Sequence, residues 1–435
     1  MNKPGISLAA IFWIGLPGML LAQVGPTQLS LQDAQAMALK NHPQILASQA
    51  NYLRANQVVT ETRSAYYPTL NGDITGSQAN QDARIGAGFL TDSRLFNRAG
   101  YGVTLSQLIT DSGRTPNLVA SSRLQAQASR QDYQATRFDV VLGVDQAYYD
   151  VLLAQSLVTV ARQTIATRQT VVNQVSELFK NQLKSQVDLS FAQVNLSDAQ
   201  LMLIRAQDSL QSSFANLAQA LGTQQSVTYQ LVDQPASPEP PSEPEQLIAQ
   251  AFRNRPELAS LRLQREADEK FARAERDLKL PTVSLTGVAG GLPWIEPGNA
   301  NPHIPGEYEG AALNVQIPVF NGHLFSARRQ AAEYQLTAAD QHVRDLQDRI
   351  ARDVRTAWAH ARTAYQAIGV TAQLVQQANL ALDLAQGRYN LGLASIVELT
   401  QAQLSQTQAQ VENVNAKYEY QDAYAALQYT LGLLH

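Results

Sequence analysis

LKSQVDLSFAQ at residues 183–193 and LASIVELTQAQ at residues 393–403 are two copies of one segment. Leucine, serine, valine, leucine, alanine and glutamine recur in both copies in the same order and at the same intervals. Each copy starts at a break between two long helical patterns, and in each a serine is followed three residues later by an acid. Such agreement between the halves of a chain indicates an internal duplication, in which two repeats build the same structure.

The duplication extends outward from these segments. Asn-x-Pro occurs at residues 41–43 and again at 254–256. The residue before a proline resists helical geometry, while proline itself suits the first turn of a helix, so each repeat is predicted to open with two helices that meet at this step. The predicted limits are residues 23–222 for the first repeat, 246–435 for the second, and 223–245 for an extended, proline-rich connector between them.

Two segments of alternating polarity follow the opening helices of each repeat. Leu70 and Ile74 alternate with Asn71 and Thr75, which is the period of a β-strand with one apolar and one polar face. Strands are predicted at about residues 69–78, 99–109, 282–291 and 308–318, each long enough to cross a bilayer as a tilted strand. The stretch 290–309, which contains Trp294, is expected to form an outward-facing loop.

Very long helices are predicted after the strands. No proline lies between Pro116 and Pro235, and none follows Pro318. From Val354 to Tyr389 the apolar and small residues recur with a period of about 3.5, which is typical of helices that supercoil around neighbours. Each repeat is therefore expected to end in a long antiparallel coiled-coil hairpin, at about residues 113–222 and 322–432.

Composition excludes several classes of function. The 435 residues include 33 Lys+Arg and 37 Asp+Glu, a balance that argues against a nucleic-acid partner. The absence of cysteine excludes disulfides, thiolate metal sites and lipidation of an N-terminal cysteine. The six histidines lack metal-ligating spacing, and no phosphate-binding loop or nucleophile elbow occurs. We therefore expect no enzymatic activity, no cofactor and no bound metal.

The first 22 residues have the features of a cleaved signal peptide. Lys3 precedes an apolar run from Ile6 to Leu21, and Ala22 offers a small residue for cleavage. This run of about 16 residues is shorter than the roughly 20 that a membrane-spanning helix needs. An exported chain is therefore expected, and any membrane that it crosses must be crossed by its strands.

Four strands cannot close a barrel by themselves. An open sheet edge in lipid leaves unpaired backbone groups, which cost several kcal/mol each. If these strands span a membrane, the chain must therefore associate with copies of itself. Two, three or four copies would give eight, twelve or sixteen strands, and the strand pattern alone does not choose among them.

A resemblance to a known family distinguishes between these numbers of copies. The Asn-x-Pro steps, Tyr-Tyr-Pro at residues 66–68, Lys-Leu-Pro at 279–281 and RYNLGLASIVE at 388–398 together resemble the TolC-type outer-membrane efflux proteins. The resemblance implies a mixed all-α plus β-barrel fold: a homotrimer with a twelve-stranded barrel in outer-membrane lipid, continued by a periplasmic α-barrel. It also implies a passive exit duct of a tripartite efflux or type I secretion system, bound to a periplasmic adaptor (membrane fusion) protein and an inner-membrane pump of RND or ABC type. The residues leave the cargo and the pump class open, and an exported coiled-coil scaffold or adhesin without a pore remains the alternative.

In that family the two helical turns form the periplasmic tip, which binds the adaptor and closes the duct. The residues expected to contact the adaptor are Leu183, Ser185, Leu391, Gly392, Leu393, Ala394 and Ser395. Gly392 suits the left-handed residue that ends a helix, whereas the first repeat places Gln182 there. Lys184 also replaces Ala394, so the first turn departs from the family pattern.

Asp188 and Glu398 are the candidates for the gate of the duct. As the acids of Ser-x-x-Asp and Ser-x-x-Glu they are predicted to form capping boxes, and Asp188 is expected to form the weaker one because Glu or Gln is usual there. A second, compatible hypothesis is that copies related by symmetry form rings of negative charge that favour cations. Gln401 stands where related proteins often carry a further acid, so a weak acidic gate is expected.

Overall fold

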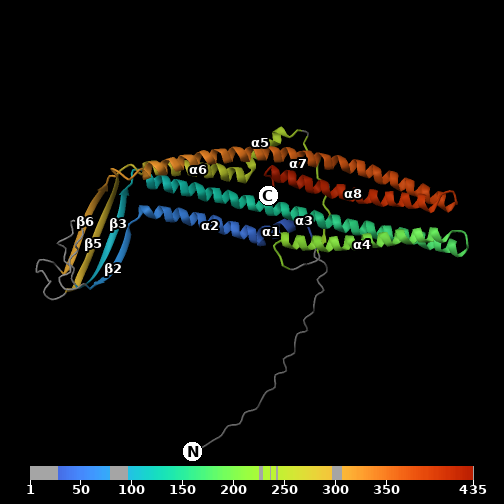
Figure 1. The fold of residues 1–435 in the computed structure, drawn as a ribbon, viewed down its shortest axis with the longest axis horizontal. Helices are drawn as coiled ribbons and strands as arrows, with labels where there is room; N and C mark the ends of the chain where they lie inside the picture. Colours follow the sequence, from blue (N-terminus) through green and yellow to red (C-terminus); the bar gives the residue numbers. More distant parts are fainter. Residues whose placement is uncertain are drawn as a thin grey trace, which may run out of the picture.

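The computed structural model of the chain describes residues 28–78, 97–224, 229–235, 237–241, 243–295 and 306–434. The molecule is long and narrow, with a β-sheet at one end and the turns of two helical hairpins at the other (Figure 1). The predicted signal peptide, residues 1–22, and half of the predicted loop 290–309, residues 296–305, lie outside the described residues.

The same series of elements occurs twice along the chain. Helices α3 and α7 have 67 residues each, and their returning partners α4 and α8 have 35 each. The elements of the first half are β1 Gln28–Leu29, α1 Leu31–Asn41, α2 Pro43–Arg63, η1 Ser64–Tyr66, β2 Thr69–Ser77, β3 Arg98–Thr110, α3 Arg114–Lys180 and α4 Gln186–Ala220. Those of the second half are β4 Gln230–Leu231, α5 Glu245–Asn254, α6 Pro256–Asp277, β5 Thr282–Ile295, β6 Glu307–Gln316, α7 Leu324–Asn390 and α8 Ile396–Thr430.

The strands form one antiparallel sheet in the order β2-β3-β5-β6. Its register places Leu70 opposite Leu105, and Val103 opposite Ala289, so the apolar residues of neighbouring strands share one face. That face is open: Leu70 is 68% exposed and Ile74 is 92% exposed. Side chains alternate along each strand, so the other face carries mostly small and polar residues such as Asn71 and Thr104, together with Val288 and Tyr308.

Strand β5 is longer than the sequence pattern indicates. It reaches Ile295, which pairs with Arg98, and Trp294 pairs with Ala99. The expectation that Trp294 lies in a loop is therefore wrong. The alternation of polarity fades beyond Gly291, but pairing with β3 continues the ladder, and backbone hydrogen bonds to a partner can extend a strand whose own pattern is weak.

The long helices pack into a layer through small residues. Helix α3 lies between α4 and α8 in the half that holds the turns, and between α2 and α6 in the half next to the sheet. Ala192, Ala199 and Ala206 of α4 are buried at intervals of one heptad, which is the spacing of a coiled-coil seam. Alanine leaves little side chain between the helices, so the helices of each hairpin approach closely.

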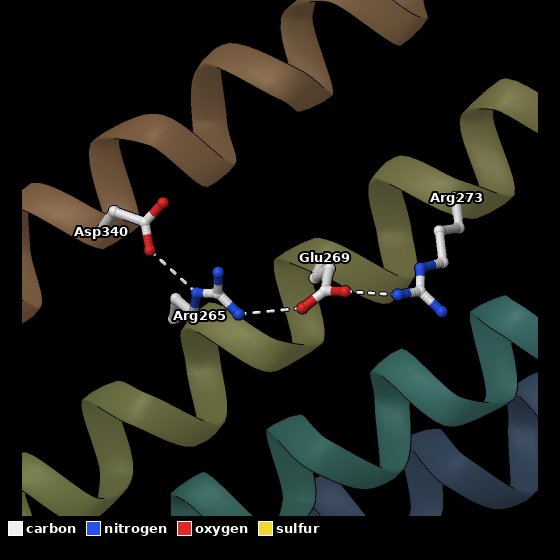
Figure 2. A network of polar contacts seen from close by, with 4 residues as sticks. All are labelled: Arg265, Glu269, Arg273 and Asp340. Atoms are coloured by element: carbon white, nitrogen blue, oxygen red, sulfur yellow. Dashed lines mark hydrogen bonds and ion pairs between the residues drawn. The ribbon is translucent and has the colours of Figure 1, made fainter.

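Charged side chains connect α6 to α7 near the sheet. Figure 2 shows Arg265 of α6 between Asp340 of α7 and Glu269 of its own helix, with Arg265 Nε 2.8 Å from Asp340 Oδ1. Arg273 extends this network to the second oxygen of Glu269. The network ties two helices that share few large apolar residues, although exposed ion pairs add little stability individually.

The connector lies across the middle of the helices. Proline lacks an N–H, but its carbonyl still accepts hydrogen bonds. Trp358 Nε1 donates to the Pro241 carbonyl at 2.7 Å, and the Tyr420 hydroxyl donates to the Pro238 carbonyl. The Tyr148 hydroxyl bonds to Leu29 and Val232, where β1 and β4 form a short parallel pair. Aromatic donors on three long helices therefore fix an extended segment that has few donors of its own.

Among the described helices, none is both long enough and apolar enough to cross a membrane.

Candidate functional site at the two helical turns

Both hairpins reverse direction through the same backbone motif. In the first, Leu183 N–H donates to the Leu178 carbonyl and Gln182 N–H donates to the Phe179 carbonyl. In the second, Leu393 and Gly392 make the same two bonds. This is the Schellman arrangement that satisfies the last carbonyls of a helix, and it needs one left-handed residue. Gly392 and Gln182 fill that place with φ of 76° and 59°.

Gln182 therefore does what Gly392 does, in spite of its Cβ. A side chain in the left-handed region costs roughly 1–2 kcal/mol, which glycine avoids. The first turn departs from the family pattern in sequence, but its main chain follows the same path as the second.

Asp188 forms a complete capping box with Ser185. The Ser185 hydroxyl accepts a hydrogen bond from Asp188 N–H at 3.2 Å, while Asp188 Oδ2 accepts from Ser185 N–H at 2.9 Å. Burial opposes ionisation of Asp188, but the hydrogen bonds from Ser185 and the charge of Lys184 outweigh it and hold its pKa below the usual value. The carboxylate stays charged and stabilises the start of α4.

Glu398 forms only half of the corresponding box. Its N–H donates to the Ser395 hydroxyl at 3.3 Å, but its carboxylate turns to Arg388 Nε, 3.1 Å away. The expectation that Asp188 forms the weaker box is therefore wrong. The shorter Asp188 side chain reaches back to its own cap, whereas the longer Glu398 side chain reaches a cation on the other side of the turn.

Apolar side chains project from both turns. We use the name tip surface for five exposed residues: Leu183 (69% exposed), Val187 (61%), Leu391 (76%), Leu393 (66%) and Val397 (58%). Ser185 and Ser395 are exposed between them, and Ala394 is half-buried against the core that joins the hairpins. Exposed leucines and valines on neighbouring turns are typical of a surface that binds another protein.

The structure also brings the two turns together. Tyr389 is only 2% exposed and packs with Val171 and Val175 of α3, and Lys184 Nζ lies 4.1 Å from the centre of its ring. Gln174 adds a 2.9 Å hydrogen bond to Asn390. Burial, and then the charge of Asp188, raise the pKa of the Tyr389 phenol. Sequence patterns did not assign these contacts, because they join residues far apart in the chain.

The chemistry available at the turns is that of charge and apolar contact. Across the described ranges, no group of three or more His, Cys, Asp or Glu side chains could hold a metal ion. Two carboxylates, Asp188 and Glu398, lie within two adjacent apolar turns. Such an arrangement can bind a protein partner and attract cations.

The model of the family described as outer membrane efflux protein matches residues 35–223 and 247–433. The chain belongs to this family. Each matched stretch holds one of the two series of helices and strands, so the family pattern is carried once by each half.

Curated relatives match over nearly the whole chain. The outer membrane efflux protein BepC of Brucella suis is 24% identical over 404 residues, which cover 93% of this chain and 85% of BepC. The outer membrane protein TolC of Vibrio cholerae is 24% identical over 410 residues, covering 93% of this chain and 91% of TolC.

Solved structures share the fold. The CmeC outer membrane channel of Campylobacter jejuni superposes with a TM-score of 0.79 at 19% identity, covering 92% of this chain and 85% of CmeC. The outer membrane protein VceC of Vibrio cholerae gives 0.79 at 17% identity, covering 92% and 96%. The combination of a strand domain with long helical hairpins is therefore the fold of outer-membrane channel proteins.

Proposed function

We propose that three copies of this chain form a passive exit duct through the outer membrane and the periplasm. The four strands of each copy would contribute to a twelve-stranded barrel, and the hairpins would continue it as a helical barrel. The observation that carries the proposal is the sheet, which has one open apolar face and whose outer strands, β2 and β6, each pair with one strand in the part of the chain that the structure describes.

The order of the helices supports closure into a ring. Along the sheet, β2 and β6 are the outer strands. In the helical layer, α2 and α4 lie at one edge and α7 at the other. The strands of the sheet and the helices of the layer therefore follow the same order from one edge of the chain to the other. A single rotation can then bring both β6 and α7 of one copy to β2, α2 and α4 of the next. Such head-to-tail interfaces generate closed rings.

Exposed apolar seams lie on those helical edges. Val194 and Leu201 lie one heptad apart on α4, and Val370 and Leu374 lie one turn apart on α7. All four are at least 44% exposed in the single chain. Apolar seams of this kind are buried when helices pair. We therefore expect the helices of a second copy to pack against them.

The faces of the sheet support its place in a membrane. Leu70, Ile74 and Leu313 lie on the face that would meet lipid, and they are among the most exposed large apolar residues of the strands. The opposite face would line the duct. An apolar outer face and a polar inner face are the pattern of outer-membrane barrels.

The proposed partners follow from family membership and from the tip surface. CmeC is described as an outer membrane channel and BepC as an outer membrane efflux protein, and we extend that role to this chain. The tip surface would bind a periplasmic adaptor, which would connect the duct to an inner-membrane pump of RND or ABC type. Asp188 and Glu398 would form the charged constriction.

Export completes the proposal. The first 22 residues would be removed as a signal peptide, and no lipid would be attached, because the chain has no cysteine. Sequencing the N-terminus of the protein purified from outer membranes tests this, with a start near Gln23 as the expected result.

Cysteine cross-linking tests the ring. Because the natural chain has no cysteine, every disulfide must come from an introduced pair. We would place one cysteine at Asn71 of β2 and the second, in turn, at positions 310–316 of β6. At the matching register, β2 of one copy meets β6 of the next, and oxidation should give a ladder that ends at three chains.

A ladder ending at two chains, or recovery only in soluble extracts as a monomer, would contradict the proposal. The scaffold or adhesin alternative would then explain the long hairpins better. Conductance of the purified trimer across a planar bilayer is the complementary measurement, because a scaffold without a pore would not conduct.

A further inference from the structure

Cations gather where the sheet joins the helices. Arg114 of α3 and Arg328 of α7 approach the two oxygens of Glu275 at 3.6 and 3.7 Å, and Arg276 lies 3.5 Å from Asp277. Arg276 is 62% exposed and Arg328 is 52% exposed, whereas Glu275 is only 5% exposed. Lys279 and Arg63 are exposed nearby, at the ends of α6 and α2. We call these five cations the basic collar.

Two acids at this level, Asp111 and Asp277, are buried and have hydrogen-bond partners, whereas Glu61 near the end of α2 is exposed. Asp111 accepts hydrogen bonds from Thr115, and Asp277 Oδ2 accepts one from Asn117 at 3.0 Å. The contacts of Arg114 and Arg328 with Glu275 are longer than direct hydrogen bonds. In addition, Arg114 Nε is buried without a hydrogen-bond partner among the described residues. The exposed guanidinium groups of Arg276 and Arg328 make only long contacts with these acids, so they keep donors that can reach a ligand.

An apolar and aromatic band adjoins the collar on the side of the sheet. It consists of Tyr66 (45% exposed), Tyr67 (63%), Ile317 (62%), Val319 (93%) and Phe320 (81%). All five lie in the short segments between the strands and the helices. Tyrosines are enriched where a protein passes through a membrane–water interface. The surface is thus apolar next to the sheet and cationic one helical turn further along.

We propose that the basic collar binds the phosphate groups of anionic phospholipids in the leaflet that meets the helical end of the sheet. The proposal rests on the membrane-spanning sheet proposed above. A phospholipid has acyl chains beside a phosphodiester, and the band and the collar offer the two complementary surfaces in that order. Arginine suits the phosphate group, because its planar donors match two phosphate oxygens at once.

Lipid retention by the purified trimer tests the proposal. The full-length protein would be reconstituted with equal amounts of phosphatidylglycerol and phosphatidylcholine, returned to mild detergent and analysed by native mass spectrometry. The test variant is Arg276→Gln with Arg328→Gln. The matched control is Arg349→Gln with Arg352→Gln, which removes two cations of 54% and 68% exposure further along α7.

We expect the wild type and the control to retain phosphatidylglycerol over phosphatidylcholine. The test variant should lose this preference, by about fivefold for each cation removed. If it does not assemble, Lys279→Gln with Arg63→Gln provides a second variant, since neither side chain contacts Glu275 in the structure.

Two results would overturn the inference. Equal retention of both lipids by a conducting wild-type trimer would do so while leaving the proposed duct intact. Unchanged lipid retention with altered ion selectivity in the test variant would show that the cations face the duct. A wild-type protein that fails to form a membrane-inserted trimer would instead contradict the proposed function itself.

Discussion

Two equivalent acids have different local roles, and the reason is one residue. Asp188 closes a capping box, while Glu398 pairs with Arg388 across its turn. In the first repeat the position of Arg388 is occupied by Leu178, and Asp188 instead interacts with Ser185 and with the charge of Lys184. The Asp188 carboxylate is consequently engaged in capping its own helix. The Glu398 carboxylate is held by an exposed ion pair that contributes at most about 1 kcal/mol to stability. Glu398 is the better candidate for a gate.

Conductance measurements on Glu398→Ala test that role. If copies of Glu398 form a ring of charge, its removal should lower the preference for cations over anions in planar bilayers, because the local negative potential falls. The matched variant is Arg388→Gln, which breaks the same ion pair but leaves the carboxylate in place. It should keep or increase cation preference. If both variants change selectivity in the same direction, the ion pair matters and the charge ring does not.

Asp145 predicts a pH dependence of the contact between α1 and α3. It is 4% exposed, and burial raises its pKa to about 6 even though Gln35 donates a hydrogen bond to it. A raised carboxyl pKa means that the folded state holds the proton more tightly than the unfolded state. The associated stability is therefore complete below about pH 4 and is lost as the pH rises through 6.

Hydrogen exchange of the α1 amides measures this effect. Between pH 4.5 and 7.5, protection in the wild type should fall by up to about 2 kcal/mol, because stability is lost at about 1.4 kcal/mol per pH unit between pH 4.5 and the pKa of about 6. Asp145→Asn should remove the dependence and be better protected at pH 7.5, while Asp132→Asn, on an exposed part of α3, should behave like the wild type. Parallel curves for the wild type and Asp145→Asn would contradict this account.

At the scale of elements, local patterns identified what is local. The alternation of Leu70 and Asn71 predicted a strand, which the structure contains. The spacing of about 3.5 residues predicted a seam from Val354 to Tyr389, and it holds in part: Val354, Ala361 and Tyr389 are buried, whereas Tyr365, Ala372 and Asn379 are exposed. The Ser185–Asp188 capping box could also be predicted from the sequence, because both residues belong to one helical turn.

Contacts between distant elements could not be read in this way. The end of β5 depends on pairing with Arg98, so Trp294 was assigned to a loop. The contact of Lys184 with Tyr389 joins separate hairpins, and no local sequence pattern around either residue predicts that the two are in contact. Likewise, Trp358 fits the heptad period but serves to hold the connector.

The alanine seam makes a prediction about packing. Ala199 is 4% exposed between α3 and α4, so Ala199→Leu should force the helices apart and cost about 1–3 kcal/mol. Ala215→Leu, at an exposed position of the same helix, should have little effect, since both residues favour helix equally well. Thermal unfolding followed by circular dichroism compares the two. Equal unfolding midpoints for the two variants would mean that the interface between α3 and α4 can accommodate a leucine at residue 199 without strain.

At the scale of the whole molecule, the single chain leaves apolar surfaces and sheet edges exposed that a folded protein usually covers. Among the described residues, its sheet ends at β2 and β6 and has an open apolar face, and its helical layer has exposed seams at the edges α4 and α7. These features need no separate explanations, because one head-to-tail contact between copies would cover the edges and seams, and lipid would cover the face. The duplication would help, because three copies with two similar repeats each would give six similar units around the proposed ring.

Charge placed on one edge should therefore prevent assembly. Ile204 of α4 is 62% exposed and Val370 of α7 is 66% exposed, so Ile204→Glu or Val370→Lys should change the single chain little. Within a ring each would bury a charge three times over, and the yield of trimer by native mass should fall at least about tenfold. Gln163→Lys is the control, because α3 has neighbours on both sides within the chain and an exposed α3 residue lies on a face of the layer. If Ile204→Glu and Val370→Lys assemble as well as Gln163→Lys, then α4 and α7 do not meet between copies, and the ring must close through other surfaces.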